Sequence, residues 1–247
     1  MCLAMALAAC ADSGGAGLNH ELTVSAAASL TDAFTDIGRA FERREDGVTV
    51  TFNFGPSDGL AQQINEGAPV DVFASASSMW MDSVQHDGPG LSGRTVFAGN
   101  SLAIAVPASN PAGIERIEDL SEDDVKLVLA AEGVPVGEYA REALSKAGVA
   151  DAALANVVSN EEDVRAVLTK VLSGDADAGI VYVTDVTNDV ADRLSLIEIP
   201  HDVNVIATYP MAVVSGSKEA DLAKRFIDYV LGDGQRTLAD HGFLPAA

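Results

Sequence analysis

The amino-acid sequence predicts an α/β fold, because signals for strands and helices alternate along most of the chain. Short apolar runs typical of buried strands recur, and between them apolar residues are spaced three and four apart, as on one helix face. The 247 residues are 48% hydrophobic, which is enough for one large domain or two modest ones, each with its own core. No repeat of fixed period interrupts the alternation.

The first group of predicted elements lies before residue 108. Strands are predicted where the sequence is apolar or alternates apolar with polar residues: 22–26, 48–54, 70–74 and 101–107. The first helix is predicted from apolar residues at helical spacing: Leu30, Ala33, Phe34, Ile37 and Phe41. A second helix, over residues 60–66, is predicted to end before Gly67.

A second group of the same kind follows in the rest of the chain. The predicted strands are residues 125–130, 178–183 and 203–209, with a short apolar segment at 210–214. The predicted helices are residues 138–146, 164–172 and 220–231. The two groups are compatible with two α/β lobes.

The charge of the chain excludes several classes of partner. The net charge of −22 argues against nucleic-acid binding, because that requires clustered Lys and Arg. It also argues against adsorption to an anionic membrane face. A small anion is still possible, because a buried site responds to nearby dipoles more than to distant, screened charges. The four histidines show no metal-ligand spacing, and no phosphate-binding G-x-x-x-x-G-K-[ST] motif is present.

The N-terminal segment carries both cysteines, Cys2 and Cys10. The apolar run ending in Leu7-Ala-Ala-Cys10 resembles the lipobox of bacterial lipoproteins. The resemblance implies cleavage before Cys10 and lipidation of its sulfur. Residues 1–20 would then be a signal remnant and tether, and the lipid anchor would be the only contact with the membrane. The alternative is the tail of an ordinary signal peptide with an incidental cysteine.

Four junctions that lead into predicted helices carry small or hydroxylic residues. Ser29-Leu-Thr-Asp32 reads as a capping box in which the Ser29 hydroxyl accepts from the Asp32 amide. Ser57 begins a helix after the turn 55–59. The Val136 amide follows the turn at 134–135, and Asn160 as N-cap would leave the Val164 amide in a first turn. Each junction alone predicts only a helix cap, although first-turn amides also attract anions.

The turn Gly55-Pro-Ser-Asp-Gly59 also matches G-x-S-x-G, the nucleophile elbow of α/β-hydrolases. Ser57 would then be the nucleophile, with Asp185 and either His201 or His241 as partners. Two observations argue against a hydrolase. Only one strand of the globular part precedes the strand that leads to this turn, and no HGGG-like oxyanion segment is present.

Seven short segments, in register over nearly the whole chain after the N-terminal tether, carry a more specific resemblance. They are Ala27-Ala-Ser-Leu30, Gly67-Ala-Pro-Val-Asp-Val-Phe73, Trp80-Met-Asp82, Gly99-Asn-Ser-Leu102, Val134-Pro-Val-Gly-Glu-Tyr-Ala140, Gly179-Ile-Val-Tyr182 and Tyr209-Pro-Met-Ala-Val-Val214. In these the chain resembles the molybdate-binding proteins of molybdate ABC transporters. The resemblance implies that five residues donate hydrogen bonds to the anion: Ser29 and Ser57 through side chain and backbone, Val136 and Val164 through backbone N–H, and Tyr182 through its hydroxyl.

The same resemblance implies the type II periplasmic binding protein fold, with two α/β lobes, two crossover segments and a ligand cleft between the lobes. Lobe 1 would comprise residues 21–100 and 211–247, lobe 2 residues 101–210, with crossings near 99–103 and 209–213. The expected protein is a monomer and not an enzyme. It would have no cofactor and no protein-ligated metal, and it would deliver molybdate or tungstate to ABC transporter permease subunits. It would be exported to the periplasm or cell surface.

The identity of the ion depends on the chemistry of the donors. Molybdate is a dianion near neutral pH and needs only hydrogen-bond donors, which hydroxyls, amides and a phenol supply without a cation. Pro56 and Asp58 depart from the family pattern. Pro56 removes one N–H, and the Asp58 carboxylate could accept a proton from a protonated oxyanion such as hydrogen phosphate, or simply face solvent in a first helical turn. Sulfate and phosphate therefore remain alternatives.

Overall fold

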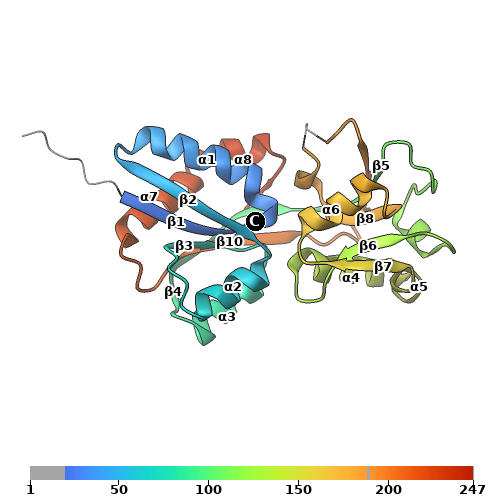
Figure 1. The fold of residues 1–247 in the computed structure, drawn as a ribbon, viewed down its shortest axis with the longest axis horizontal. Coiled ribbons are helices and arrows are strands. Elements are labelled where there is room, and N and C mark those ends of the chain that lie inside the picture. The colour runs from blue at the N-terminus through green and yellow to red at the C-terminus, as the bar shows by residue number, and fades with distance from the viewer. Residues whose placement is uncertain (1–19, 188–189, 247) are drawn as a thin grey trace, which may run out of the picture.

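Two β-sheets side by side organise the chain into two lobes, as the computed structural model shows for residues 20–187 and 190–246 (Figure 1). The first sheet has six strands in the order β11-β4-β10-β3-β1-β2, and the second has five in the order β7-β6-β8-β5-β9. Helices pack on both sheets, and the strand orders show that consecutive strands are often not neighbours. The predicted α/β fold with two lobes is confirmed.

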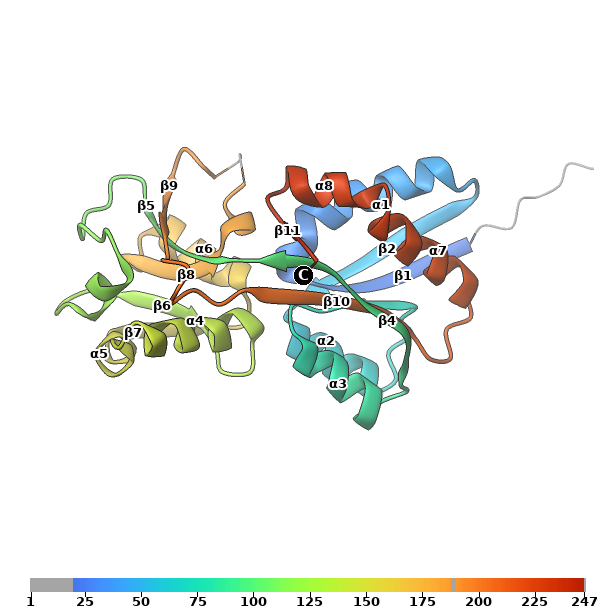
Figure 2. The same ribbon diagram turned by 180° about the vertical axis from the view of Figure 1, so that it is seen from behind.

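The six-stranded sheet forms lobe 1. Its strands are β1 (His20–Ala27), β2 (Val48–Gly55), β3 (Val72–Ala74), β4 (Leu91–Asn100), β10 (Ala207–Val214) and β11 (Leu244–Pro245). Its helices are η1 (Ala28–Leu30), α1 (Thr31–Arg44), α2 (Ser57–Asn65), α3 (Ser78–Asp87), α7 (Ala220–Leu231) and α8 (Gly234–Asp240). Strand β1 pairs in parallel with β2 and β3, whereas β10 is antiparallel to β3 and β4. Helices α1, α7 and α8 cover one face and α2 and α3 the other (Figures 1 and 2).

Aromatic side chains fill the core under α1. Phe34 packs against Phe52, Phe97 and Phe226, with ring centroids 5.5–6.2 Å apart in tilted or edge-on geometries. The opposite face has its own smaller core around Leu60 and other apolar side chains of α2 and α3. Both helix layers therefore hold the strand ends of lobe 1 rigidly, which matters because the site is built at those ends.

The five-stranded sheet forms lobe 2. Its strands are β5 (Leu102–Pro107), β6 (Leu127–Ala130), β7 (Val157–Glu161), β8 (Ala178–Tyr182) and β9 (Leu194–Glu198). Its helices are η2 (Ile117–Ser121), α4 (Pro135–Lys146), α5 (Ala150–Ala155), α6 (Val164–Ser173) and η3 (Val183–Asp185). Strand β6 is parallel to β7 and β8, and β5 is antiparallel to β8 and β9. Gly179 of β8 lets α6 approach closely, since a Cβ there would lie 2.7 Å from Val167.

Two segments connect the lobes, and Figure 2 shows them running between the sheets. The first passes from β4 to β5 through Ser101, inside the expected range 99–103. The second, between β9 and β10, occupies residues 199–206. The expectation of a crossing at 209–213 is wrong, because those residues lie inside β10 of lobe 1.

The misplaced second crossing has a local cause. Residues 200–204 form a turn, with the Val203 and Asn204 amides donating to the Pro200 carbonyl, so the predicted strand at 203–209 starts only at Ala207. The Asn204 side chain accepts a hydrogen bond from the Leu102 N–H and donates one to the Leu102 carbonyl. These are the hydrogen bonds that the backbone of a neighbouring strand would make. A register shift between Tyr209 and Pro210 lets proline remain in the sheet.

Some elements were not predicted at all. Strands β4, β7 and β9 have many exposed or half-buried residues, so they lack the continuous apolar pattern that marks β5 or β8. Helix α2 begins at Ser57, as the junction at 55–59 predicts; the apolar pattern starts only at residue 60, because the first turn of the helix is polar. Within the described ranges, no helix has the length and apolar character required to cross a membrane.

The start of α4 depends on a glycine. A Cβ on Gly137 would lie 2.4 Å from the Ala131 carbonyl oxygen and 2.5 Å from that of Ala130. We expect Gly137→Ala to push the helix start away from β6 and to lower the free energy of unfolding by about 1–3 kcal/mol, measured by urea denaturation. Gly59→Ala is the matched control, because Gly59 is also the third residue of its helix and its Cβ would meet only the Pro56 side chain at 3.4 Å. Equal losses in both variants would contradict this explanation.

Candidate binding site between the lobes

A small cavity, partly open to solvent, lies where the two lobes meet. Its lining comes from the ends of strands and the starts of helices in both lobes: Ala27, Ala28, Ser29, Gly55, Pro56, Ser57, Ala76, Val134, Pro135, Val136, Asp163, Val164 and Tyr182. All five residues predicted to bind the anion are among them. The described lining contains neither Lys nor Arg, so an anion there would meet no fixed cation.

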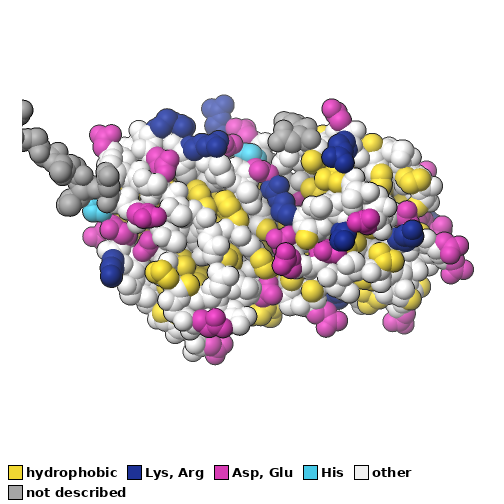
Figure 3. Space-filling view, viewed as in Figure 1, with side chains coloured by type: hydrophobic (Ala, Val, Ile, Leu, Met, Phe, Trp, Pro, Cys, Tyr) yellow, Lys and Arg dark blue, Asp and Glu magenta, His cyan; other side chains and the backbone are white. Residues whose placement is uncertain are grey.

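The chain as a whole is acidic. Figure 3 shows Asp and Glu side chains distributed over one face of both lobes, in keeping with the net charge of −22. Attraction for an anion must therefore come from local dipoles rather than from the overall field of the protein.

Lobe 1 contributes two buried serines. Ser29 lies in η1, and its Oγ is 2.8 Å from the hydroxyl of Tyr209. The predicted capping box is wrong: the N-cap of α1 is Leu30, with no side-chain cap, because the Ser29 hydroxyl is engaged with Tyr209 instead. Ser57 is the first residue of α2, and its Oγ accepts from the Ala76 amide at 3.1 Å.

Lobe 2 contributes the first turns of two helices. Val136 is the second residue of α4, which has no side-chain cap, and Val164 is the first residue of α6. First-turn N–H groups have no intrahelical acceptor and carry the positive end of the helix dipole. The predicted N-cap Asn160 is wrong: it lies in β7, and the cap is Asp163, whose carboxylate accepts from the Ala166 amide at 2.8 Å.

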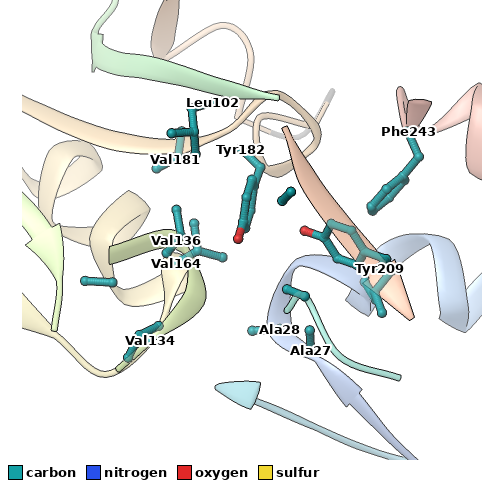
Figure 4. Close-up of a cluster of buried hydrophobic side chains, with 14 of the residues drawn as sticks. Ala27, Ala28, Leu102, Val134, Val136, Val164, Val181, Tyr182, Tyr209 and Phe243 are labelled. Atoms are coloured by element: carbon teal, nitrogen blue, oxygen red, sulfur yellow. The ribbon is translucent and has the colours of Figure 1, made fainter. Parts of the chain in front are cut away.

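Tyr182 ends β8 and turns its ring toward the interface. Its side chain is buried, and its hydroxyl has no hydrogen-bond partner within the described residues. The ring stands edge-on to Tyr209, with centroids 6.0 Å apart and the two hydroxyls facing one another across the lobes (Figure 4). Burial raises the pKa of Tyr182 well above 10, so the phenol keeps its proton and is a hydrogen-bond donor. A buried hydroxyl without a partner is costly, which indicates a missing acceptor at this point.

The predicted hydrolase partners of Ser57 do not assemble around it. His241 bonds Asp36 at 3.0 Å, and His201 is an exposed turn residue. Asp185 is fully buried, but its carboxylate accepts from the Tyr182 amide at 2.9 Å. Ser57 is instead held by a backbone amide, which does not activate a nucleophile.

The acidic residues near the turns have separate roles. Asp58 is half-buried rather than directed to solvent, and it does not belong to the lining. Asp163 does line the cavity, but one of its oxygens caps α6. Glu161 and Glu162 are absent from the described lining.

Several direct contacts join the lobes, including a hydrogen bond from Asn100 Nδ2 to Thr184 Oγ1 at 2.8 Å. Arg165 pairs with Asp32 at 2.5 Å, and the Trp80 indole donates to the Gly133 carbonyl at 2.9 Å. The Tyr139 hydroxyl donates to the Ala76 carbonyl at 3.3 Å. The sequence predicted none of these pairs, because none has a local sequence signal. The structure is thus a closed arrangement of the lobes.

Asp185 gives the protein a pH-dependent stability. Burial raises its pKa to about 7, partly opposed by Arg165. Between about pH 4 and about pH 7, the Asp185 carboxyl group is protonated in the folded state and ionised in the unfolded state. The free energy of unfolding therefore falls as the pH rises over this range, by at most about 1.4 kcal/mol per pH unit. We expect Asp185→Asn to remove this fall, so that the variant loses less stability than the parent between pH 5 and pH 8 in urea denaturation. Parallel losses in the two proteins would contradict the assignment.

Comparison with known proteins places the chain in a family. The family model for bacterial extracellular solute-binding proteins matches residues 22–244. The molybdate-binding protein of Mycobacterium tuberculosis is 38% identical over 225 residues, which cover 91% of this chain and 84% of that protein. This agrees with the resemblance predicted from the sequence.

Solved structures agree with the fold. The substrate-binding domain of a molybdenum ABC transporter from Clostridium difficile is 33% identical, with a TM-score of 0.70, over 92% of this chain and 99% of that one. The periplasmic molybdate-binding protein of Azotobacter vinelandii is 20% identical, with a TM-score of 0.81, over 92% and 100% of the chains. With two lobes, a cavity between them and these relatives, the chain belongs to the bacterial extracellular solute-binding proteins.

Proposed function

We propose that this protein captures molybdate, and tungstate with it, between its lobes and delivers it to the permease subunits of an ABC importer. The observation that carries the proposal is the buried, unpaired Tyr182 hydroxyl at a cavity where the first turns of α2, α4 and α6 converge. That hydroxyl has no acceptor among the described residues. A tetrahedral oxyanion supplies several acceptor oxygens at once.

The donors act as a set drawn from both lobes. The Ser29 and Ser57 hydroxyls and nearby amides would bind from lobe 1, and the Val136 and Val164 amides with the Tyr182 hydroxyl from lobe 2. Because the ligand gains its full set of hydrogen bonds only when the lobes are together, binding favours the closed form. The permease would distinguish this closed form from the open one. No step requires a cofactor or a catalytic group.

The choice of ion follows from the donor chemistry and from the relatives. Several relatives are molybdate-binding proteins, and a lining in which helix first turns and hydroxyls supply hydrogen-bond donors suits a fully deprotonated dianion. Sulfate has shorter bonds and would fill a shell sized for molybdate less well. Hydrogen phosphate brings a proton that needs an acceptor. Sulfate and phosphate are the second candidates, and a serine hydrolase is disfavoured by the surroundings of Ser57.

Location and anchoring complete the proposal. Cys10 lies outside the described residues, and we infer from the lipobox-like segment that its sulfur carries a lipid. The mature protein would then act as a monomer at the outer surface of the membrane or in the periplasm.

Titration calorimetry with molybdate, tungstate, sulfate and phosphate tests the proposal. We expect molybdate and tungstate to bind with similar affinity, and sulfate and phosphate more weakly. Molybdate should also raise the melting temperature, because it binds the folded protein only. No heat and no thermal shift at millimolar molybdate would contradict the proposal, and equal affinity for all four ions would make this a general oxyanion binder.

The role of Tyr182 has its own test. Tyr182→Phe removes one donor and leaves the ring, so we expect molybdate binding to weaken by about 1–2 kcal/mol. Tyr229→Phe is the matched control, since Tyr229 packs against Phe41 in lobe 1 away from the cavity. Unchanged affinity in Tyr182→Phe, measured by calorimetry, would show that the phenol is only a core residue.

A further inference from the structure

The two backbone donors that lobe 2 is proposed to supply come from two different helices. Val136 lies in the first turn of α4, and Val164 begins α6. The two helices lie on opposite sides of the sheet of lobe 2 (Figures 1 and 2). The relative position of their first turns therefore depends on the strands between them, and above all on the ends of β6 and β7.

Arg141 of α4 connects these parts through its guanidinium group. Its Nη1 donates to the carbonyl of Gly137 in the first turn of α4 and to the carbonyl of Ala130 at the end of β6, both at 2.9 Å. Its Nη2 donates to Asn160 Oδ1 of β7 at 2.8 Å. The planar fork of arginine can make several such bonds at once. Glu132 lies 4.0 Å from Nε, but its side chain is 85% exposed, so this ion pair contributes little.

The packing around these contacts is tight. A Cβ on Gly137 would lie 2.5 Å from the Ala130 carbonyl oxygen, so the first turn of α4 rests directly on the end of β6. The Ala131 amide donates to the Glu161 carbonyl at 2.8 Å, which keeps β6 and β7 paired up to the point where both chains turn toward the cavity. The Arg141 side chain is only 18% exposed. Its contacts therefore belong to the interior of lobe 2.

We propose that Arg141 is a positioning residue that fixes the spacing of the Val136 and Val164 amides and so restricts the site to oxyanions of one size. The proposal rests on the proposed function, because it takes both amides as ligand donors. Arg141 itself is not among the lining residues. Hydrogen bonds weaken when their length or angle departs from the optimum, so a fixed spacing favours the ion whose oxygens match it.

The ratio of the affinities for molybdate and sulfate distinguishes this role from others. Both ions carry two negative charges near neutral pH, so the loss of a positive charge nearby weakens both alike. A loss of folding stability also acts on the protein and not on one of the ions. The ratio changes when the donors can move to suit the smaller ion.

Titration calorimetry near neutral pH measures this ratio, with sulfate also followed by its displacement of bound molybdate. In Arg141→Met, which lacks the fork and the charge, we expect the preference for molybdate over sulfate to narrow by about fivefold, as for one hydrogen bond lost. Arg141→Lys restores the charge but not the planar fork, so it should narrow the preference similarly. Arg193→Met is the matched control. It removes a charge from lobe 2 at a side chain that donates to the Leu172 carbonyl and does not line the cavity, so the ratio should not change.

The outcomes separate this inference from the proposed function. If the parent protein binds neither ion, the proposed function fails and the inference fails with it. If the parent binds molybdate and the ratio is unchanged in Arg141→Met, or returns to the parent value in Arg141→Lys, the inference alone is overturned. Where the parent binds sulfate too weakly to measure, displacement of molybdate by sulfate in the Arg141 variants supports the inference, and resistance to displacement overturns it.

Asn160→Ala gives a second test that does not depend on the folding of the Arg141 variants, which thermal melting checks. Asn160 is exposed, and the substitution removes the contact with β7 while the charge of Arg141 remains. We expect the preference for molybdate over sulfate to narrow by about threefold, because only one of the three contacts is lost. An unchanged ratio in a folded Asn160→Ala variant would overturn the inference.

Discussion

The groups between the two lobes are constrained by the free-energy cost of burying a hydrogen-bond donor without an acceptor. Closing two lobes over the starts of three helices removes water from first-turn amides and from the Tyr182 hydroxyl. Among residues 20–187 and 190–246, no side chain satisfies that hydroxyl, and the lining that they form contains no Lys or Arg. Under the proposed function, a small anion between the lobes supplies the acceptor that this hydroxyl lacks among the described residues.

The direct contacts between the lobes are too weak to replace such a ligand. Arg165 and Asp32 are about one-third exposed, and an ion pair of that kind contributes about 0–1 kcal/mol. The Trp80 and Tyr139 hydrogen bonds are single bonds to carbonyl groups. A closed form held by a few modest contacts responds readily to ligand, because the ligand's differential affinity then decides the population of open and closed forms.

The candidate site was predictable in its residues but not in its geometry. Ser29, Ser57, Val136, Val164 and Tyr182 were named from sequence words, and all five line one cavity. The capping box was wrong because a side chain 180 positions away takes the hydroxyl that a local rule assigns to the helix. The N-cap at Asn160 was wrong because β7 extends further than its sparse apolar pattern indicated. Local rules fail where a distant partner competes for the same group.

The sequence by itself determined the alternation of strands and helices and the family. The alternation follows from local periodicity, and the family follows from short segments that resemble it in register. The tertiary structure alone decided which strands are neighbours, where the chain passes between the lobes, and that Tyr209 stands behind Ser29. The physical reason is that sheet order and hydrogen-bond pairing depend on groups brought together by packing, and no local pattern records those partners.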